Sequence, residues 1–194
     1  MIRFFSSKAA KWLLHAGAIS VEDKGLFEYG IYSIVFTSIP LILVLIVGSF
    51  FHMVFEGVLM ILPFMLIRKF CGGFHLRSPA ACLIVSTAVL TAFLAAIRFT
   101  LYTQCFHWNF IMLLASFFLI SKLSPVDSEN RRLTIAEKKL FKRIAITLAG
   151  FFVLLYIVLV LLGQVRAAVS VGSGVILSAA LQIPCLIRYK GFRV

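Results

Sequence analysis

The chain has 194 residues, of which 62% are apolar and only 13% are charged, and its formal net charge is +12 at pH 7. Soluble domains carry about a quarter charged residues to cover their surface, so this composition excludes a soluble globular protein and predicts an integral membrane protein. The positive charge does not predict a nucleic-acid partner, because no part of the sequence combines base-stacking aromatic residues with a basic groove.

The first 20 residues are predicted to form an amphipathic helix that lies in the membrane interface. Apolar residues recur there at helical spacing, while Lys8, Lys11 and His15 fall on the other face. The apolar positions are Ile2, Phe5, Ala9, Trp12, Ala16 and Ile19. Lys8 and Lys11 also interrupt any apolar core of a cleavable signal peptide. For the first few residues, a frayed basic tail is the alternative.

Six transmembrane helices are predicted to follow, because long stretches without charged residues are typical of membrane spans. The longest such stretches are 29–55, 99–121, 144–165 and 167–187. The predicted spans are, in chain order, 30–48, 50–67, 79–97, 102–120, 144–163 and 167–187. Four spans with two re-entrant segments are the alternative, because the second and fourth spans are the weakest.

The only substantial hydrophilic loop, 121–143, lies between the fourth and fifth spans. Of the 19 Lys and Arg residues, 17 fall on one side of this six-span arrangement, and only Arg98 and Arg166 fall on the other. Because Lys and Arg accumulate in cytoplasmic loops, the split predicts that both termini and the 121–143 basic loop are cytoplasmic. The predicted fold class is therefore all-α, with a single polytopic membrane domain over 1–194.

The residues best suited to chemistry lie between the second and third spans, on the predicted cytoplasmic side. Gly72 and Gly73 permit a tight turn at the end of one helix, and a Ser-Pro pair suits the start of the next. Cys82 is then predicted in the first turn of the third span, where the helix dipole favours the thiolate. His75 lies seven residues earlier and can approach Cys82 as its general base.

Other interpretations of this segment stay open. It can be a simple turn between two helices, with Cys82 packed as a small apolar residue. Cys71 is a competing nucleophile, although it lies at a helix C-terminus, where the dipole disfavours a thiolate. A metal site formed by Cys71, His75 and Cys82 lacks a fourth ligand of suitable spacing. The four cysteines show no CxxC pairing, so neither disulfides nor a metal is predicted, and no cofactor is expected.

Arg68, Gly73, His75 and Cys82 follow the pattern R-x4-G-x-H-x6-C, which resembles the motif of the accessory gene regulator B (AgrB) family. Further similarity lies in four segments: 22–24 and 28–30 resemble the family's opening, and 124–127 and 130–132 resemble its central basic loop. The chain length and the number of spans also fit. The resemblance therefore covers most of the chain.

The resemblance implies a bacterial cell-membrane cysteine endopeptidase that processes an AgrD-like precursor of a cyclic quorum-sensing peptide. It implies that Cys82 is the nucleophile and His75 its base, at the cytoplasmic face. Cleavage is expected to pass through a thioester acyl-enzyme and to lead to a lactone or thiolactone ring. A homodimer is also implied.

Two supporting roles are expected around the implied dyad. Arg68 is expected to bind an acidic part of the precursor, and the alternative is that it anchors the helix at the membrane interface. Gly73, next to Gly72, is expected to let the substrate backbone come close. The cytoplasmic basic residues are expected to attract membrane lipids as well as an acidic precursor tail.

A second functional class is a multi-span transporter or exporter of a small peptide or solute without proteolytic activity. Charged residues inside membrane spans usually mark transport pathways. The only one here is Glu56, four residues after His52, and we expect the two as a solvated pair at the end of the second span. A purely structural membrane subunit is the third class.

Overall fold

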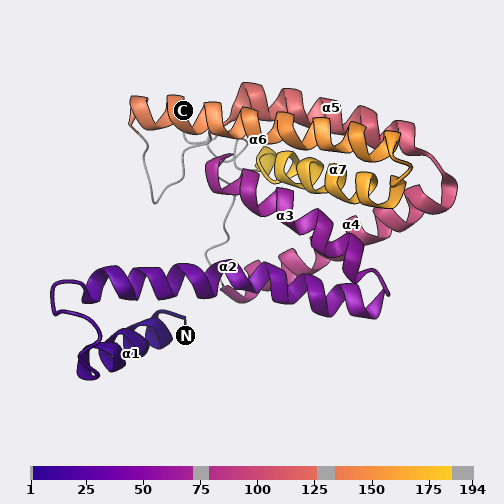
Figure 1. The fold of residues 1–194 in the computed structure, drawn as a ribbon. Coiled ribbons are helices and arrows are strands. Elements are labelled where there is room, and N and C mark those ends of the chain that lie inside the picture. The colour runs from indigo at the N-terminus through magenta and orange to yellow at the C-terminus, as the bar shows by residue number, and fades with distance from the viewer. Residues whose placement is uncertain (1, 72–78, 126–133, 185–194) are drawn as a thin grey trace. The chain divides into compact units, whose positions relative to one another are not determined.

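The computed structural model describes residues 2–71, 79–125 and 134–184, and in these residues the chain is all-helical, as predicted (Figure 1). Its seven helices are α1 (Ile2–His15), α2 (Lys24–Phe50), α3 (Val54–Cys71), α4 (Pro79–Thr103), α5 (Phe106–Leu123), α6 (Ile135–Leu161) and α7 (Val165–Ala180). Each of the six predicted spans overlaps one of the helices α2 to α7, and residues 185–187 of the sixth lie outside the described residues.

Three helical segments in the described residues are long and apolar enough to cross a membrane. These segments are Ala81–Thr103, Phe106–Leu123 and Ile135–Leu161. Two further apolar segments, Ser38–Phe50 and Val165–Ala180, are shorter. The 16 residues of α7 extend only about 24 Å, against a hydrocarbon core of about 30 Å. These helices therefore support the prediction that the chain is a membrane protein. The predicted count of six spans and their predicted orientation are not tested by them.

The chain divides into two compact units, Met1–Leu43 and Val44–Val194. The first unit holds α1 and the first part of α2, and α1 carries Phe5 and Trp12 as exposed side chains. Exposed aromatic residues beside lysines are typical of a helix that contacts lipid. The placement of this helix in the membrane interface stays a prediction, as does the single domain over 1–194.

Helix α1 ends at His15, earlier than the predicted end at residue 20, because Gly17 terminates it. Gly17 has a φ of 69°, in the left-handed region that glycine adopts without strain. Its N–H donates to the carbonyl of Leu14 over 3.1 Å, and the N–H of Ala18 donates to the carbonyl of Leu13 over 3.0 Å. These two bonds form a Schellman ending, which satisfies the last carbonyls of the helix and stops it.

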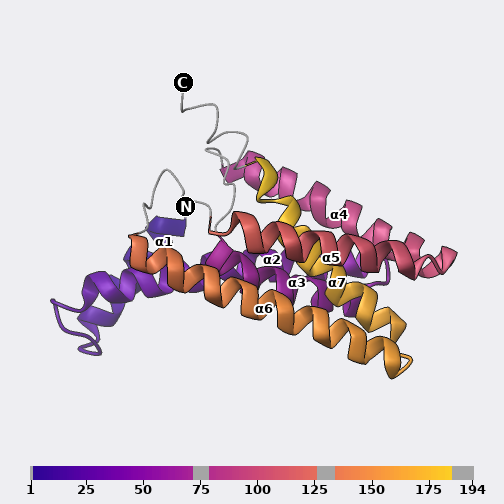
Figure 2. The ribbon, with the colours of Figure 1, turned by 90° about the horizontal axis from the view of Figure 1, so that it is seen from above.

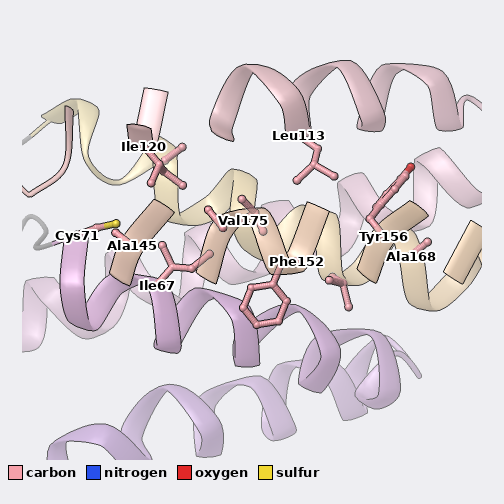
Figure 3. Packing of buried hydrophobic residues seen from close by; sticks show 12 residues of the cluster. Ile67, Cys71, Leu113, Ile120, Ala145, Phe152, Tyr156, Ala168 and Val175 are labelled. Carbon is pink, nitrogen blue, oxygen red and sulfur yellow. The ribbon is translucent and has the colours of Figure 1, made fainter. Parts of the chain in front are cut away.

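The second unit is built around α7, which contacts α3, α4, α5 and α6 (Figures 1 and 2). Between Ala167 and Ala179, every side chain of α7 except that of Ile176 is buried. The neighbouring helices contribute the rest of one buried cluster, which includes Ile67, Cys71, Leu113, Ile120, Ala145, Phe152 and Tyr156 (Figure 3). Helix α7 therefore has little surface left to face lipid.

Small residues let the helices approach α7 closely. A Cβ atom added to Gly174 would overlap with the carbonyl oxygen of Met60 and would lie 2.5 Å from the ring of Pro63, both on α3. A Cβ atom added to Gly172 would lie 2.9 Å from the ring of Tyr156 on α6. These distances are below any normal carbon contact, so the packing of α7 requires glycine at both positions.

The second unit has two ends with different chemistry. At one end, residues from the turn after α2, the end of α4 and the start of α7 line one cavity. Arg98 and Arg166, the two basic residues that the sequence set apart from the others, both lie there. We call this the Arg98 end. At the other, the Cys71 end, the C-terminal ends of α3, α5 and α7 meet at Cys71, Ser124 and Gln182.

Helix α6 begins at Ile135, nine residues before the predicted span. Thr134 caps it: its hydroxyl accepts a hydrogen bond from the Glu137 N–H, and the Glu137 carboxylate accepts one from the Thr134 N–H. This capping box satisfies free N–H groups and fixes the start of the helix. Nine residues of the predicted 121–143 loop, 135–143, therefore lie on the first turns of α6, and four of them are basic: Lys138, Lys139, Lys142 and Arg143.

Glu56 is buried, so the prediction of a solvated pair with His52 is wrong. Its side chain is about 1% exposed in the first turn of α3, and its carboxylate accepts hydrogen bonds from Nε of Arg166, over 2.9 Å, and from Nη2. A carboxylate that leaves water needs a cationic hydrogen-bond partner. Arg166 can provide it because it lies in the first turn of α7, which packs against α3.

Candidate active site

Arg68 and Cys82 are the two ends of the predicted motif, and the structure describes both. Arg68 lies in the last turn of α3, and its guanidinium lies over the ring of Phe64, 5.5 Å from the ring centre. Cys82 is the fourth residue of α4. The other predicted site residues lie outside the described residues: Gly72, Gly73 and His75. The structure therefore does not place the implied Cys-His dyad.

The position of Cys82 suits a reactive thiol. Helix α4 begins at Pro79, where the Ser-Pro pair predicted it, so Cys82 lies in the first turn. The N–H groups of a first turn have no partner within the helix, and the dipole of the following residues points its positive end there. The side chain is half-buried, which leaves part of it accessible to a substrate.

Cys71, the competing nucleophile, lies in a very different environment. It ends α3 and is completely buried, and its Sγ lies 3.1 Å from Oγ of Ser124. Ser124 Oγ in turn lies 3.3 Å from Oε1 of Gln182, just after α7. Burial raises the pKa of the Cys71 thiol, although the hydrogen bonds of Ser124 and Gln182 and the charge of Arg68 oppose the shift. Cys71 is therefore held as a neutral thiol that is poorly suited to attack a carbonyl carbon.

The sequence did not reveal the cluster of Cys71, Ser124 and Gln182. These residues lie 53 and 58 positions apart, on the ends of three helices. Patterns of helical spacing relate residues within one helix only. The one local signal is that a polar residue follows the apolar helices α5 and α7, at Ser124 and Gln182.

The raised pKa of Cys71 leads to a prediction about alkylation. In the folded protein at pH 8, we expect Cys71 to react with N-ethylmaleimide at least about tenfold more slowly than the exposed Cys105. Because a raised pKa lowers the thiolate fraction at a given pH, the Cys71 rate should keep rising with pH above the usual range of a free thiol. Peptide mass spectrometry after timed labelling measures both rates. Equal rates before denaturation would contradict the buried environment of Cys71.

Residues 6–186 match the family described as Accessory gene regulator B. The chain is 28% identical over 126 residues to AgrB-like protein 2 of Clostridium perfringens (strain 13 / Type A) and 25% identical over 126 residues to an AgrB-like protein of Clostridium perfringens (strain SM101 / Type A). Each match covers 61% of this chain and 58% of the relative, which is less than two thirds of the relative's length. No solved structure matches the chain.

Proposed function

Since this chain belongs to the accessory gene regulator B family, we propose that it is a membrane cysteine endopeptidase that cleaves the C-terminal tail from an AgrD-like precursor of a quorum-sensing peptide. The observation that carries the proposal is the position of Cys82, half-buried in the first turn of α4. It is supported by the buried state of Cys71, which makes the other thiol near the motif a poor nucleophile.

In the proposed reaction, His75 takes the thiol proton of Cys82, and the thiolate attacks a carbonyl carbon of the precursor. The peptide bond breaks, the leaving amine takes the proton, and the C-terminal tail departs. A thioester then joins the shortened precursor to Cys82. A precursor thiol or hydroxyl attacks this thioester, displaces the Cys82 thiolate and closes a thiolactone or lactone ring. The ring forms only if water is kept from the thioester.

A group of basic residues supports binding of an acidic part of the precursor. The last turn of α3 carries Arg68 and Lys69. The first turns of α6 lie against it, because the ring of Phe70 meets that of Phe141 edge to face at 5.8 Å. The lysines at the start of α6 therefore belong to the same end of the unit as Arg68. Clustered basic residues at a membrane surface attract acidic peptides and anionic lipids alike.

The transporter alternative gains no support from Glu56. Intramembrane carboxylates mark transport pathways when they line a polar route across the membrane. Glu56 instead lies in the first turn of α3 and is bound by Arg166, at one end of the unit. The ion pair with Arg166 compensates the buried charge of Glu56, so the carboxylate is explained without a transport role.

Trapping of the acyl-enzyme tests the proposed function. Membranes that contain this chain and the precursor encoded in the neighbouring reading frame are quenched with acid and digested. The Cys82 peptide is expected to carry the mass of the precursor without its tail, and hydroxylamine should remove it, because hydroxylamine cleaves thioesters. Release of the tail without any such adduct would contradict the thioester, and an intact precursor would contradict the endopeptidase.

A further inference from the structure

The Arg98 end of the second unit is hollowed, opposite the Cys71 end where α3, α5 and α7 terminate. A cleft of about 580 Å³ opens there between the turn after α2, the end of α4 and the start of α7. A second cavity of about 330 Å³ shares Phe51, Arg98 and Tyr102 with it and continues along α4 to Leu94 and Ala95. The two cavities therefore form one groove, which is polar at the helix end and apolar toward the middle of α4.

The polar part of the groove carries an uncompensated positive charge. The Glu56 carboxylate faces the cleft, but its charge is neutralised by Arg166. Arg98 also lines the cleft, and among the described residues it makes no hydrogen bond or ion pair. A guanidinium presents paired N–H groups that match the oxygens of a phosphate or carboxylate. The charge of the cleft is thus complementary to an anion.

The backbone around the cleft is held in an unusual conformation. His52 has a φ of 54° and Gln104 a φ of 55°, and within the described ranges these are the two residues other than glycine with positive φ. Both line the cleft. At His52 this conformation closes the end of α2, because the Met53 N–H donates to the carbonyl of Gly48 over 2.8 Å and the His52 N–H donates to that of Ser49 over 3.2 Å. The turns at His52 and Gln104 are far apart in the sequence, and both bring a left-handed backbone conformation to the same cleft.

We propose that the groove binds one anionic phospholipid, with its phosphate on Arg98 and an acyl chain along Ala95 and Phe99. The apolar part of the groove lies on Ala81–Thr103, a segment long enough to cross the membrane, and Phe99 is exposed there. An acyl chain in that position runs on into the bilayer, whereas a soluble anion would leave the apolar part empty. Basic pockets between membrane helices bind anionic headgroups in this way.

Native mass spectrometry of the full, delipidated chain in detergent tests the headgroup. Phosphatidylglycerol is expected to bind in one tight copy, and phosphatidylcholine at least about tenfold more weakly, because only the former leaves a net negative charge for Arg98. Arg98→Gln should weaken phosphatidylglycerol binding about tenfold. Lys122→Gln is the matched control, because Lys122 is exposed near the end of α5 at the Cys71 end, and it should retain the tight copy. Equal binding of the two lipids, or an equal loss in both variants, would overturn the proposal.

A second pair of variants tests the acyl chain. Ala95→Trp fills the apolar part of the groove and should also weaken phosphatidylglycerol binding about tenfold, whereas Ala96→Trp places the same side chain one residue away, outside both cavities. Glycerol 3-phosphate supplies the headgroup alone and should not compete at equal concentration. If glycerol 3-phosphate bound as tightly as the lipid, or if an apolar peptide with a free carboxylate displaced it, the lipid would be the wrong occupant.

Discussion

Replacement of Cys82 by alanine is expected to lower the rate of precursor cleavage by about 10³-fold or more, since loss of a nucleophile removes the covalent route altogether. Cys71→Ala is the matched control, because it removes the other thiol of the motif region. We expect that variant to cleave within about threefold of the unmodified chain, since a buried neutral thiol does not take part in the attack. The measurement is tail release from the precursor, read by mass spectrometry and normalised to the protein in the membrane.

The two variants separate three outcomes. Loss of cleavage in Cys82→Ala alone supports Cys82 as the nucleophile. Loss in Cys71→Ala alone would exchange the roles of the two thiols, despite the burial of Cys71. Cleavage at the unmodified rate by both variants would exclude each of these two thiols as the required nucleophile. Membrane insertion of each variant is checked by the accessibility of Cys105, which is exposed and distant from both positions in the sequence.

Helices α2 to α7 could be predicted because each carries enough apolar residues in succession, and α1 because its apolar residues recur at helical spacing. Their ends could be predicted only where a local signal existed. The Ser-Pro pair placed the start of α4 correctly, because proline fits the first turn of a helix. The Schellman ending at Gly17 and the capping box of Thr134 and Glu137 were equally local signals, and they move the ends of α1 and α6 from the predicted positions.

The interior position of α7 could not be predicted in the same way. A membrane helix is apolar whether it faces lipid or other helices, so its hydropathy does not tell the two apart. The distinction lies in side-chain size, because a helix enclosed by four others needs small residues on all sides. The Ala, Ser and Gly residues of α7 carry that information, but the sequence does not say which helices will surround them.

In the candidate site, too, features set by residues close in the sequence could be predicted, and contacts between distant residues could not. The place of Cys82 in a helix start follows from its near neighbours and could be predicted. The environment of Cys71 depends on Ser124 and Gln182, and that of Glu56 depends on Arg166, 110 residues away. Such contacts between side chains of different helices depend on how the helices pack, so the sequence alone did not reveal them. The roles of His75 and of the two glycines stay predictions.

Gly174→Ala is expected to destabilise the fold by about 3 kcal/mol or more, because the new methyl group would overlap with the carbonyl oxygen of Met60 and the ring of Pro63. Backbone and a proline ring cannot turn aside as a flexible side chain does, so α7 and α3 would have to separate. A loss of this size lowers the unfolding temperature of a chain of this length by roughly 6–12 °C. Thermal unfolding in detergent at one fixed heating rate measures the difference.

Gly150→Ala is the matched control for this prediction. Gly150 lies within α6, and a Cβ atom there would meet only the ring of Phe117, at an ordinary 3.7 Å. Alanine at that position should leave the unfolding temperature unchanged or raise it slightly, since glycine inside a helix costs about 0.5–1 kcal/mol relative to alanine. Two variants with the same unfolding temperature would show that α7 is not packed against α3 as described. A loss confined to Gly174→Ala would instead locate the tightest contact of the unit at the crossing of these two helices.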